Sequence, residues 1–481
     1  MRVLVTGATG FIGRALVPAL QREGHAVVAL VRSATRARAR LGAEVTLLED
    51  DGRHAALAAA VAGCDAVVNL AGEPVVGRRW TAARKRELVD SRVGLTGRLA
   101  TAIVAAPMPP AVFISSSAVG VYGDSGSDRL TEDATPGRGF LPNLCLQWEA
   151  AARAAASNDT RVALLRIGVV LGRDGGALGQ MVPPFSLGLG GPFGHGRQFV
   201  PWIHLHDLVG IILTALSDAR FSGVINAVAP EPVDSRTFAR ALGQALHRPA
   251  LLPVPALALR VLLGGAAAVL LDSQRVVPAR LDALGYAWRY ATLAPALADI
   301  VERADVEIGP VPSASNPLAP PAADYLCRRP AAYLLRTRTR LQAPLDQTFE
   351  FFSRAENLGL ITPAEMQFRI DGSVPAIDTG TIINYRMRVG PLPIRWRTRI
   401  ARWEPGQCFV DSQEHGPYAS WYHEHHFRAD GTETVMEDRV YYAPPFGLLG
   451  RLANTLFIRA TLRRIFAHRS DIIRLRFGQG D

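Results

Sequence analysis

The sequence predicts an α/β protein that begins with a doubly wound parallel sheet under a small helical cap and ends in a separate α+β domain. Three observations support this prediction. Short apolar, β-branched runs alternate with helical patterns through the first half. A segment rich in proline and small residues, Gly309–Pro321, then interrupts the chain. Beyond it the pattern changes to successive strand-like runs and one closing helix.

The alternating part contains the expected parallel strands. Gly172–Pro201 is rich in glycine and proline, and the chain beyond it is mostly helical to about Arg303. We expect this stretch to form a cap over the carboxyl edge of the sheet, where open α/β proteins hold their ligands. The expected strands are Arg2–Val5, Val27–Val31, Val45–Leu48, Ala66–Leu70, Val112–Ser115 and Val162–Ile167. A further short strand, Gly223–Ala227, is expected within the cap.

The last part has a different order of elements. Tyr333–Leu341 alternates as a strand, Pro344–Ser353 and Glu356–Ile361 resemble short helices, and the chain closes with a helix at about Leu448–Phe477. Between them we expect strands at Phe368–Gly372, Gly380–Val389, Ile394–Trp403, Cys408–Glu414, Ala419–Arg428 and Glu433–Tyr442. The expected division is 1–235, 236–308, a linker at 309–323, and 324–481.

Composition excludes several classes of function. The net charge of +10 comes almost wholly from arginines interleaved with acids, so a nucleic-acid surface is not predicted. The most apolar stretch, Ala256–Leu271, is too short for a membrane span. The four cysteines have neither metal-site nor disulfide spacing, so neither a metal site nor a disulfide is predicted. Together with an opening strand that lacks a leader pattern, this predicts a cytoplasmic protein.

The opening residues predict a dinucleotide site. Arg2–Thr6 runs into the pattern G-x-x-G-x-x-G, formed by Gly7, Gly10 and Gly13, and then into a helix. Such glycines let the backbone turn and approach a pyrophosphate, which the helix N-terminus attracts. The expected contacts in this loop are Gly7, Thr9, Gly10, Phe11, Ile12 and Gly13.

The end of the second strand indicates which cofactor is bound. Val31 is followed by Arg32, where an acidic residue would hold an NAD ribose. A cation there complements a 2′-phosphate, so the sequence favours NADP. The alternative is that Arg32 is one of many surface arginines.

Several motifs in order resemble a known family. The runs TGATGFIG, NLAGEPVVGRRW, SSSAVGVYGD, CLQWEAAA, LRIGVVLG and WIHLHDL are similar to those of the atypical extended short-chain dehydrogenases, in the TIGR01777 or SDR39U1-like epimerase group. The run LLDSQRVVPARLDALGY resembles the DUF1731 domain that accompanies them. The last 150 residues, with YHEHHF and PPFGLLG, resemble the START-like (SRPBCC) superfamily, which implies a helix-grip fold around an apolar cavity.

The resemblance implies further site residues. Ser117, the last hydroxyl of a serine triplet, would bind the substrate oxygen beside the nicotinamide; otherwise it ties off a strand end. Glu87 and Arg92 would face the cofactor, although they also fit a solvated helix surface. Small residues after the fourth strand allow the backbone to pass the adenosine. The remaining cofactor contacts are Leu70, Ala71, Gly72, Ser115 and Gly168.

The usual acid–base pair of this family is missing. Counted back from Trp148–Glu149, the Tyr and Lys positions of Tyr-x-x-x-Lys fall near Leu141 and Cys145. Cys145 is expected to be a packing residue, since nothing nearby is predicted to lower its pKa. Tyr122 and the cap residue His204 are the substitute acid–base candidates, while Asp207 is expected to cap the helix that begins there.

These observations leave two functions open. The primary prediction is an NADP-dependent oxidoreductase or epimerase-like enzyme acting on a small molecule, with an apolar ligand in the last domain. The alternative is an NADPH-sensing protein without turnover. In the last domain, His423 and His425 share a strand face, but no third ligand has metal-site spacing, so they are expected to line the cavity or pair at the surface. The sequence does not predict an oligomeric state.

Overall fold

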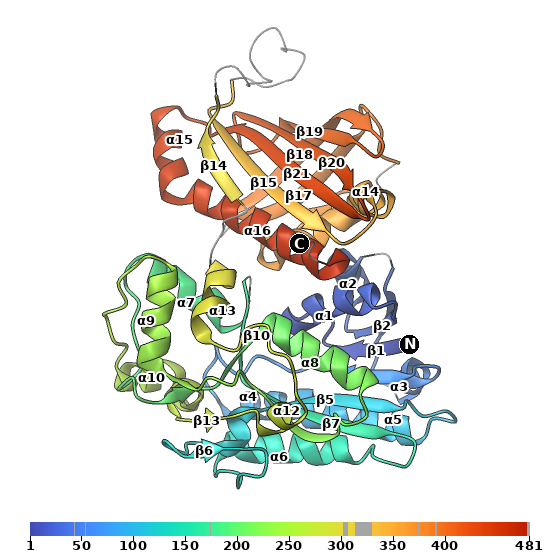
Figure 1. Cartoon of the computed structure of the whole chain (residues 1–481), viewed down its shortest axis with the longest axis vertical. Coiled ribbons are helices and arrows are strands. Elements are labelled where there is room, and N and C mark those ends of the chain that lie inside the picture. The colour runs from blue at the N-terminus through green and yellow to red at the C-terminus, as the bar shows by residue number, and fades with distance from the viewer. Residues whose placement is uncertain are drawn as a thin grey trace. The chain divides into compact units, whose positions relative to one another are not determined.

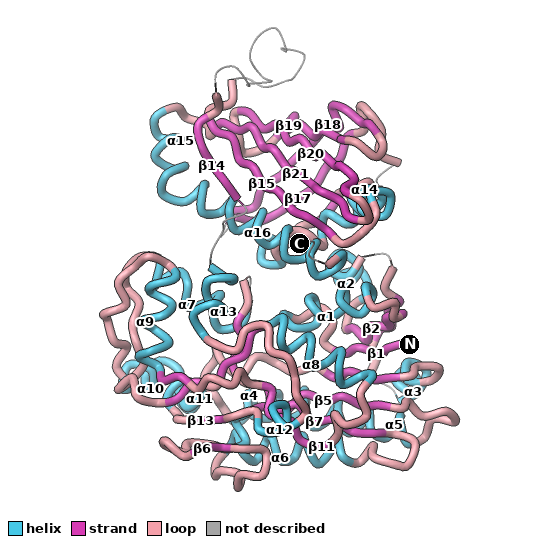
Figure 2. Tube along the Cα trace, in the orientation of Figure 1, coloured by secondary structure: helices cyan, strands magenta, loops and turns pink. Residues whose placement is uncertain are grey.

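The computed structural model describes residues 1–42, 44–52, 54–173, 175–301, 306–312, 330–373, 376–389 and 392–478. The chain divides into two compact units, Met1–Ala34 with Val45–Glu302 and Thr35–Glu44 with Arg303–Asp481. Figure 1 labels their elements and Figure 2 separates helices from strands. Among the described residues, no helix combines the length and apolarity needed to cross a membrane.

The first unit is built on a seven-stranded sheet in the order β11-β7-β5-β4-β1-β2-β3, and every adjacent pair is parallel. This confirms the predicted doubly wound sheet. The six strands expected in this sheet are present, since apolar β-branched runs can be buried on both faces only within a covered sheet. The seventh, Gly223–Ala227, was expected in the cap and instead pairs with Arg161–Ile167 at the edge of the sheet. The strands are β1 (Arg2–Thr6), β2 (Ala26–Val31), β3 (Thr46–Glu49), β4 (Ala66–Asn69), β5 (Val112–Ala118), β7 (Arg161–Ile167) and β11 (Gly223–Ala227).

Helices lie on both faces of this sheet (Figure 1). One layer contains α1 (Phe11–Arg22) and α8 (Leu205–Ser217), which contact each other. The other contains α3 (His54–Val61), α5 (Leu95–Val104) and α6 (Phe140–Arg153), whose apolar side chains form one core with the sheet. Two more helices are α2 (Ala34–Leu41) and α4 (Ala82–Val89).

The cap has one hydrophobic core, to which segments far apart in the sequence contribute. Trp202 and Leu171 pack in the same cluster as Phe238 and Leu297. The segments on either side of the predicted boundary at 235/236 thus share one core, in keeping with the expectation that 236–308 is the C-terminal part of the same module. The cap elements are β6 (Arg129–Leu130), β8 (Val169–Leu171), α7 (Gly176–Ser186), β9 (Phe199–Val200), β10 (Trp202–His204), β12 (Val233–Asp234), α9 (Ser235–Ala245), α10 (Ala256–Leu263), α11 (Ala268–Leu271), β13 (Arg275–Val276), α12 (Ala279–Ala283) and α13 (Leu293–Val301).

The second unit is an eight-stranded antiparallel sheet in the order β14-β15-β21-β20-β19-β18-β17-β16. Its long helix α16 (Arg459–Phe477) packs on the sheet core through Leu462 and Phe466. The other elements are β14 (Val306–Pro310), β15 (Tyr333–Leu341), α14 (Leu345–Phe352), β16 (Arg369–Ile370), β17 (Ile382–Val389), β18 (Leu392–Glu404), β19 (Cys408–His415), β20 (Ser420–Asp430), β21 (Glu433–Ala443) and α15 (Leu448–Ala453).

The strand β14 corrects the predicted linker. Residues 306–310 pair with β15, with Ile308 opposite Leu335, so this segment belongs to the second sheet. Composition missed it because Gly309 and Pro310 resemble linker residues, although proline is tolerated in an edge strand. The remainder of the predicted linker, 313–323, lies outside the described residues.

Candidate functional site

The glycine loop after β1 is shaped by close backbone contacts. Gly7 has φ +68°, and a Cβ there would lie 2.7 Å from the carbonyl carbon of Leu70. A Cβ on Gly13 would lie 2.4 Å from the Gly7 oxygen, so neither position has room for a side chain. Gly10 is the N-cap residue of α1 and no side chain caps this helix. The first-turn N–H groups can therefore receive an anion such as a pyrophosphate.

The side chains of this loop differ in their surroundings. Thr9, Phe11 and Ile12 are partly exposed at the start of α1. The ring of Phe11 packs against the glycines that follow β8, since a Cβ on Gly175 would lie 2.4 Å from that ring. Phe11 thus joins the dinucleotide loop to the cap.

Arg32 follows β2 and its side chain is 86% exposed. Its Nη1 lies 3.2 Å from Oε1 of Glu73, in the loop after β4. Glu73 also faces Arg84 at 3.6 Å. The end of β2 thus presents Val31 and an exposed guanidinium that pairs with the Glu73 carboxylate, and an exposed cation at this position is suited to a phosphate.

Arg92 supports the backbone of the loop after β4. This arginine is buried, and its Nη2 donates to the Glu73 carbonyl at 2.8 Å. Its guanidinium fills the space beside Gly72, where a Cβ would meet it at 3.1 Å. Glu87 pairs with Arg84 at 2.7 Å. In this structure Arg92 therefore positions the Leu70–Ala71–Gly72 backbone, a more indirect role than the sequence suggested.

A buried polar chain connects the carboxyl ends of three strands. Asn69 accepts from the Thr6 hydroxyl at 2.6 Å and donates to Thr96 at 2.8 Å. Ser115 lies 3.4 Å from the same Asn69 amide and is fully buried. Ser115 is thus part of this internal chain, and its side chain supports the site from within.

Ser117 belongs to a second buried network centred on Glu149. The Ser117 hydroxyl donates to Glu149 Oε1 at 2.8 Å, and Arg166 donates to both carboxylate oxygens at 2.8 and 3.1 Å. Burial raises the pKa of Glu149, but the hydrogen bonds and charge of Arg166 outweigh it and hold that pKa below its ordinary value. Glu149 is therefore a buried carboxylate that fixes the Ser117 hydroxyl.

Tyr122 closes the same network on its other side. Its hydroxyl accepts from Arg166 Nη1 at 2.9 Å and lies 2.7 Å from Asn226 Oδ1, to which it can donate. The ring is buried, and burial raises the pKa of the phenol. This geometry favours a structural role for Tyr122 over proton transfer.

The two residues expected at the positions of the missing Tyr and Lys lie on one helix. Leu141 and Cys145, on α6, face Gly120: a Cβ there would lie 3.6 Å from Leu141 and 3.9 Å from the Cys145 sulfur. Burial raises the pKa of the Cys145 thiol to about 12. The thiol stays protonated near neutral pH, as expected for a packing residue.

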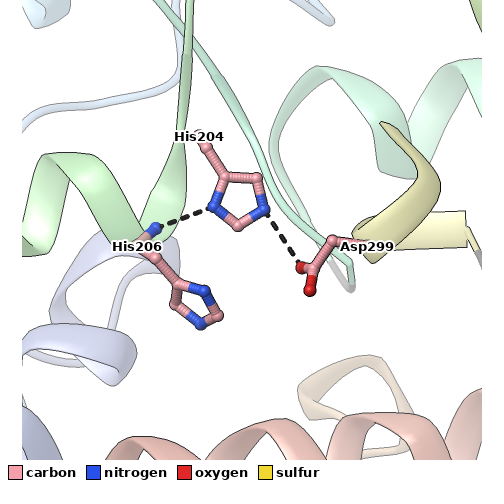
Figure 3. A group of neighbouring side chains, drawn as sticks. All are labelled: His204, His206 and Asp299. Atoms are coloured by element: carbon pink, nitrogen blue, oxygen red, sulfur yellow. Dashed lines mark hydrogen bonds and ion pairs between the residues drawn. The ribbon is translucent and has the colours of Figure 1, made fainter. Parts of the chain in front are cut away.

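His204 lies in a cluster with His206 and Asp299 (Figure 3). Its Nδ1 accepts from the His206 backbone N–H at 3.1 Å, and its Nε2 lies 3.3 Å from Asp299. Nε2 of the buried His204 ring therefore faces the Asp299 carboxylate at ion-pair distance. Its buried ring packs on Tyr290, with centroids 3.9 Å apart.

The helix cap was assigned to the wrong residue. His204, not Asp207, is the N-cap residue of α8. Asp207 instead accepts from the backbone N–H groups of Arg289 and Tyr290 at 2.8 and 3.0 Å. Gly168, at the β7–β8 junction, allows close packing, since a Cβ would lie 2.8 Å from the Pro201 oxygen.

Sequence reasoning missed Glu149 as a functional-site residue and used it only as a landmark. A signal was present, because Leu141, Cys145 and Glu149 are four residues apart and so share one helix face. No comparable signal in the sequence pointed to the partner of Glu149, Arg166. A carboxylate on the helix face that meets the end of the Ser117 strand predicts that a buried cation pairs with it. It does not predict which strand supplies that cation.

The second unit contains a cavity of about 600 Å³. Its wall is mostly aliphatic and aromatic, with contributions from β17, β18, β20 and α16. A small polar group interrupts this wall at Asp411, His423, His425 and Arg469. The two histidines therefore line a cavity, which is one of the two placements expected from the sequence.

Comparisons with known proteins agree with the first unit. Residues 3–227 match the NAD dependent epimerase/dehydratase family, and residues 254–300 match DUF1731, a domain of unknown function. The human epimerase family protein SDR39U1 is 42% identical over 305 residues, which are 63% of this chain and all of that protein. The Bacillus subtilis epimerase family protein YfhF is 34% identical over 302 residues, 63% of this chain and 98% of that protein.

Solved structures show the same similarity. The crystal structure of human SDR39U1 (isoform 2) with NADPH is 41% identical, with a TM-score of 0.58, over 63% of this chain and 99% of that one. A nucleoside-diphosphate sugar epimerase from Corynebacterium glutamicum is 34% identical, with a TM-score of 0.50, over 63% of this chain and 58% of that one. The chain therefore belongs to the NAD-dependent epimerase/dehydratase family, close to the SDR39U1-like proteins that carry DUF1731.

Proposed function

We propose that the first unit binds NADP(H) and transfers hydride between it and a carbonyl or carbinol carbon of a small molecule. The observation that carries this proposal is the tight glycine loop at the uncapped N-terminus of α1, with Arg32 in place of an acid at the end of β2. The human relative crystallised with NADPH supports the choice of cofactor. The proposal includes a cytoplasmic location, which the free thiols of Cys64, Cys145 and Cys408 favour.

Different residues of the site would hold different parts of the cofactor and the substrate. The α1 N-terminus would hold the pyrophosphate and Arg32 the 2′-phosphate. When bound, NADP(H) supplies or accepts the hydride. The Ser117 proton points to Glu149, so the Ser117 oxygen presents a lone pair. This oxygen can accept a hydrogen bond from the hydroxyl group of a substrate, so the site favours binding of a carbinol. In the oxidation of that carbinol, its hydroxyl proton would pass to water.

Fluorescence titration with NADPH and NADH tests the cofactor choice. We expect NADPH to bind at least tenfold more tightly, which corresponds to about 1.4 kcal/mol. Arg32→Ala should remove most of this preference and leave NADH binding nearly unchanged. The matched control is Arg220→Ala, another exposed arginine paired with a carboxylate, at 2.7 Å from Asp218, which precedes β11 at the opposite edge of the sheet. Equal affinities in the parent, or an unchanged preference in Arg32→Ala, would refute the role of Arg32.

A second function, NADPH sensing without turnover, is favoured by one specific observation. The side chains at the acid–base positions are Leu141 and a Cys145 thiol with a pKa of about 12, and the hydroxyls of Ser117 and Tyr122 are engaged within the protein. NADPH consumption over a panel of carbonyl compounds, measured beside NADPH binding, separates the two. Binding without consumption, even with cell extract added, would favour the sensor.

For the second unit we propose a START-like domain that holds an apolar ligand. The cavity of about 600 Å³ under α16, with its largely apolar wall, supports this. Displacement of a hydrophobic dye from the full chain by lipids and isoprenoids tests it. A cavity variant, Ile400→Trp, should reduce dye binding, and its failure to do so would argue against an occupied cavity.

A further inference from the structure

The polar group in the cavity wall arises from strand register. In the antiparallel sheet, Asp411 of β19 stands directly opposite His423 of β20, and Asp438 of β21 stands opposite His425. Cross-strand partners lie on the same face of a sheet, and His423 and His425 are two residues apart. Two histidines and two carboxylates are therefore gathered on one face of the sheet, and Asp411, His423 and His425 line the mostly apolar cavity.

Three donor atoms converge on the cavity side. Asp411 Oδ2 lies 2.9 Å from His425 Nε2 and 3.4 Å from His423 Nδ1, and the three atoms lie within 4.8 Å of one another. Ligands about 2.1 Å from one metal ion, at angles of about 90–109°, are about 3.0–3.4 Å apart. The separations from Asp411 to the two imidazoles thus match edges of a coordination polyhedron. Its other oxygen, Oδ1, lies 3.2 Å from the Thr398 hydroxyl.

A second carboxylate lies behind the histidines. Asp438 Oδ1 is 3.2 Å from His423 Nε2 and 2.9 Å from His425 Nδ1, which are the ring nitrogens directed away from Asp411. If both rings donate to Asp438, their other nitrogens direct lone pairs toward Asp411. Metal-binding histidines characteristically give their second N–H to such a carboxylate.

Arg469 balances part of the charge. Its Nη2 lies 3.1 Å from Asp438 and 3.0 Å from His425 Nδ1. In the structure His425 Nδ1 accepts from Arg469, because a guanidinium only donates. A metal on Nε2 would require the ring proton to lie on Nδ1, with Arg469 bonded to Asp438 instead. Two carboxylates thus face one guanidinium at this buried site, so their fixed charges do not cancel.

We propose that Asp411, His423 and His425 bind a divalent transition-metal ion, of the class of Zn²⁺ or Fe²⁺, with open coordination positions toward the cavity. Imidazole and carboxylate ligands suit these ions, and three protein ligands leave room for an exogenous one. The ligand class that fits is an apolar molecule with one oxygen donor, a carbonyl, carboxylate or hydroxyl group. This inference concerns a different unit from the hydride-transfer proposal and stands independently of it.

The test uses the full chain without an affinity tag, stripped by a chelator and titrated with Zn²⁺ and Co²⁺. We expect one equivalent to bind, and His425→Gln or Asp411→Asn to lower the affinity at least a hundredfold. Asp438→Asn should lower it about ten- to a hundredfold. The matched control is His426→Gln, since His426 lies on the same strand and pairs with Glu424 at 3.0 Å outside the group; its affinity should equal that of the parent.

A readout on the parent protein keeps the proposal testable if the variants fold poorly. The Co²⁺-loaded chain should show two strongly shifted exchangeable imidazole N–H signals in its proton NMR spectrum, one for each ligating histidine, and Zn²⁺ should abolish them. Absence of these signals, no binding of either ion, or equal binding by the parent, His425→Gln and Asp411→Asn would overturn the proposal.

Discussion

Substituting Glu149 by Gln should expose how much stability depends on the buried Ser117 network. The carboxylate and the Arg166 guanidinium are both buried and joined by two hydrogen bonds, so the substitution leaves a buried cation without its counter-ion. Removing one partner of such a pair costs about 3–5 kcal/mol. The matched control is Arg153→Ala, because Arg153 pairs with the same carboxylate at 3.0 Å but is half exposed, and its loss should cost less than about 1 kcal/mol.

Hydrogen–deuterium exchange of the full chain measures this locally. For peptides from α6 and β7, a loss of about 3 kcal/mol corresponds to exchange roughly a hundredfold faster, at about 1.4 kcal/mol per decade. The folded-state pKa of Glu149 lies below its unfolded value, so its stabilisation is present above about pH 4.5 and declines as pH falls through the folded value. The difference between parent and Glu149→Gln should therefore shrink in acid. Equal, small effects of Glu149→Gln and Arg153→Ala would refute the buried-pair reasoning.

Three further outcomes follow from the first unit. Gly13→Ala should weaken NADPH binding more than tenfold, because its Cβ would lie 2.4 Å from the Gly7 oxygen, whereas Gly97→Ala in α5, where a Cβ meets nothing within 4 Å, should bind normally; titration and circular dichroism check both. Cys145 should resist iodoacetamide at pH 8 until the protein is unfolded, as mass spectrometry can show, because its pKa is about 12. If turnover is found, steady-state assays should show Ser117→Ala losing more activity than Cys145→Ser; a Cys145→Ser protein that binds NADPH but is inactive would contradict this.

The two sheets could be predicted from the sequence because their signals are local. Apolar alternation placed every strand of the antiparallel sheet except β14, whose Gly309 and Pro310 suggested a linker. The site was less accessible, since its side chains meet across elements. Glu149 needs Arg166, which is 17 residues away on a strand of the main sheet. Asp411 and His423 are brought together by the pairing register of β19 and β20, which depends on the intervening turn. The third donor of the proposed metal site was therefore not predicted from the sequence.

Helix α6 presents Leu141, Cys145 and Glu149 on one face, and the first two stand at the positions where the sequence resemblance led us to expect an acid–base pair. Leu141 and Cys145 face the end of β5 and Glu149 reaches Ser117, so the helix face still meets the reacting edge of the sheet. Leucine cannot titrate, the Cys145 thiol has a pKa of about 12, and Glu149 is kept ionised by Arg166. None of the three changes protonation between about pH 6 and 9. Any turnover that this protein supports should therefore show no break in its pH–rate profile from this helix within that range, and a break that Glu149→Gln or Cys145→Ser removes would return the acid–base role to α6.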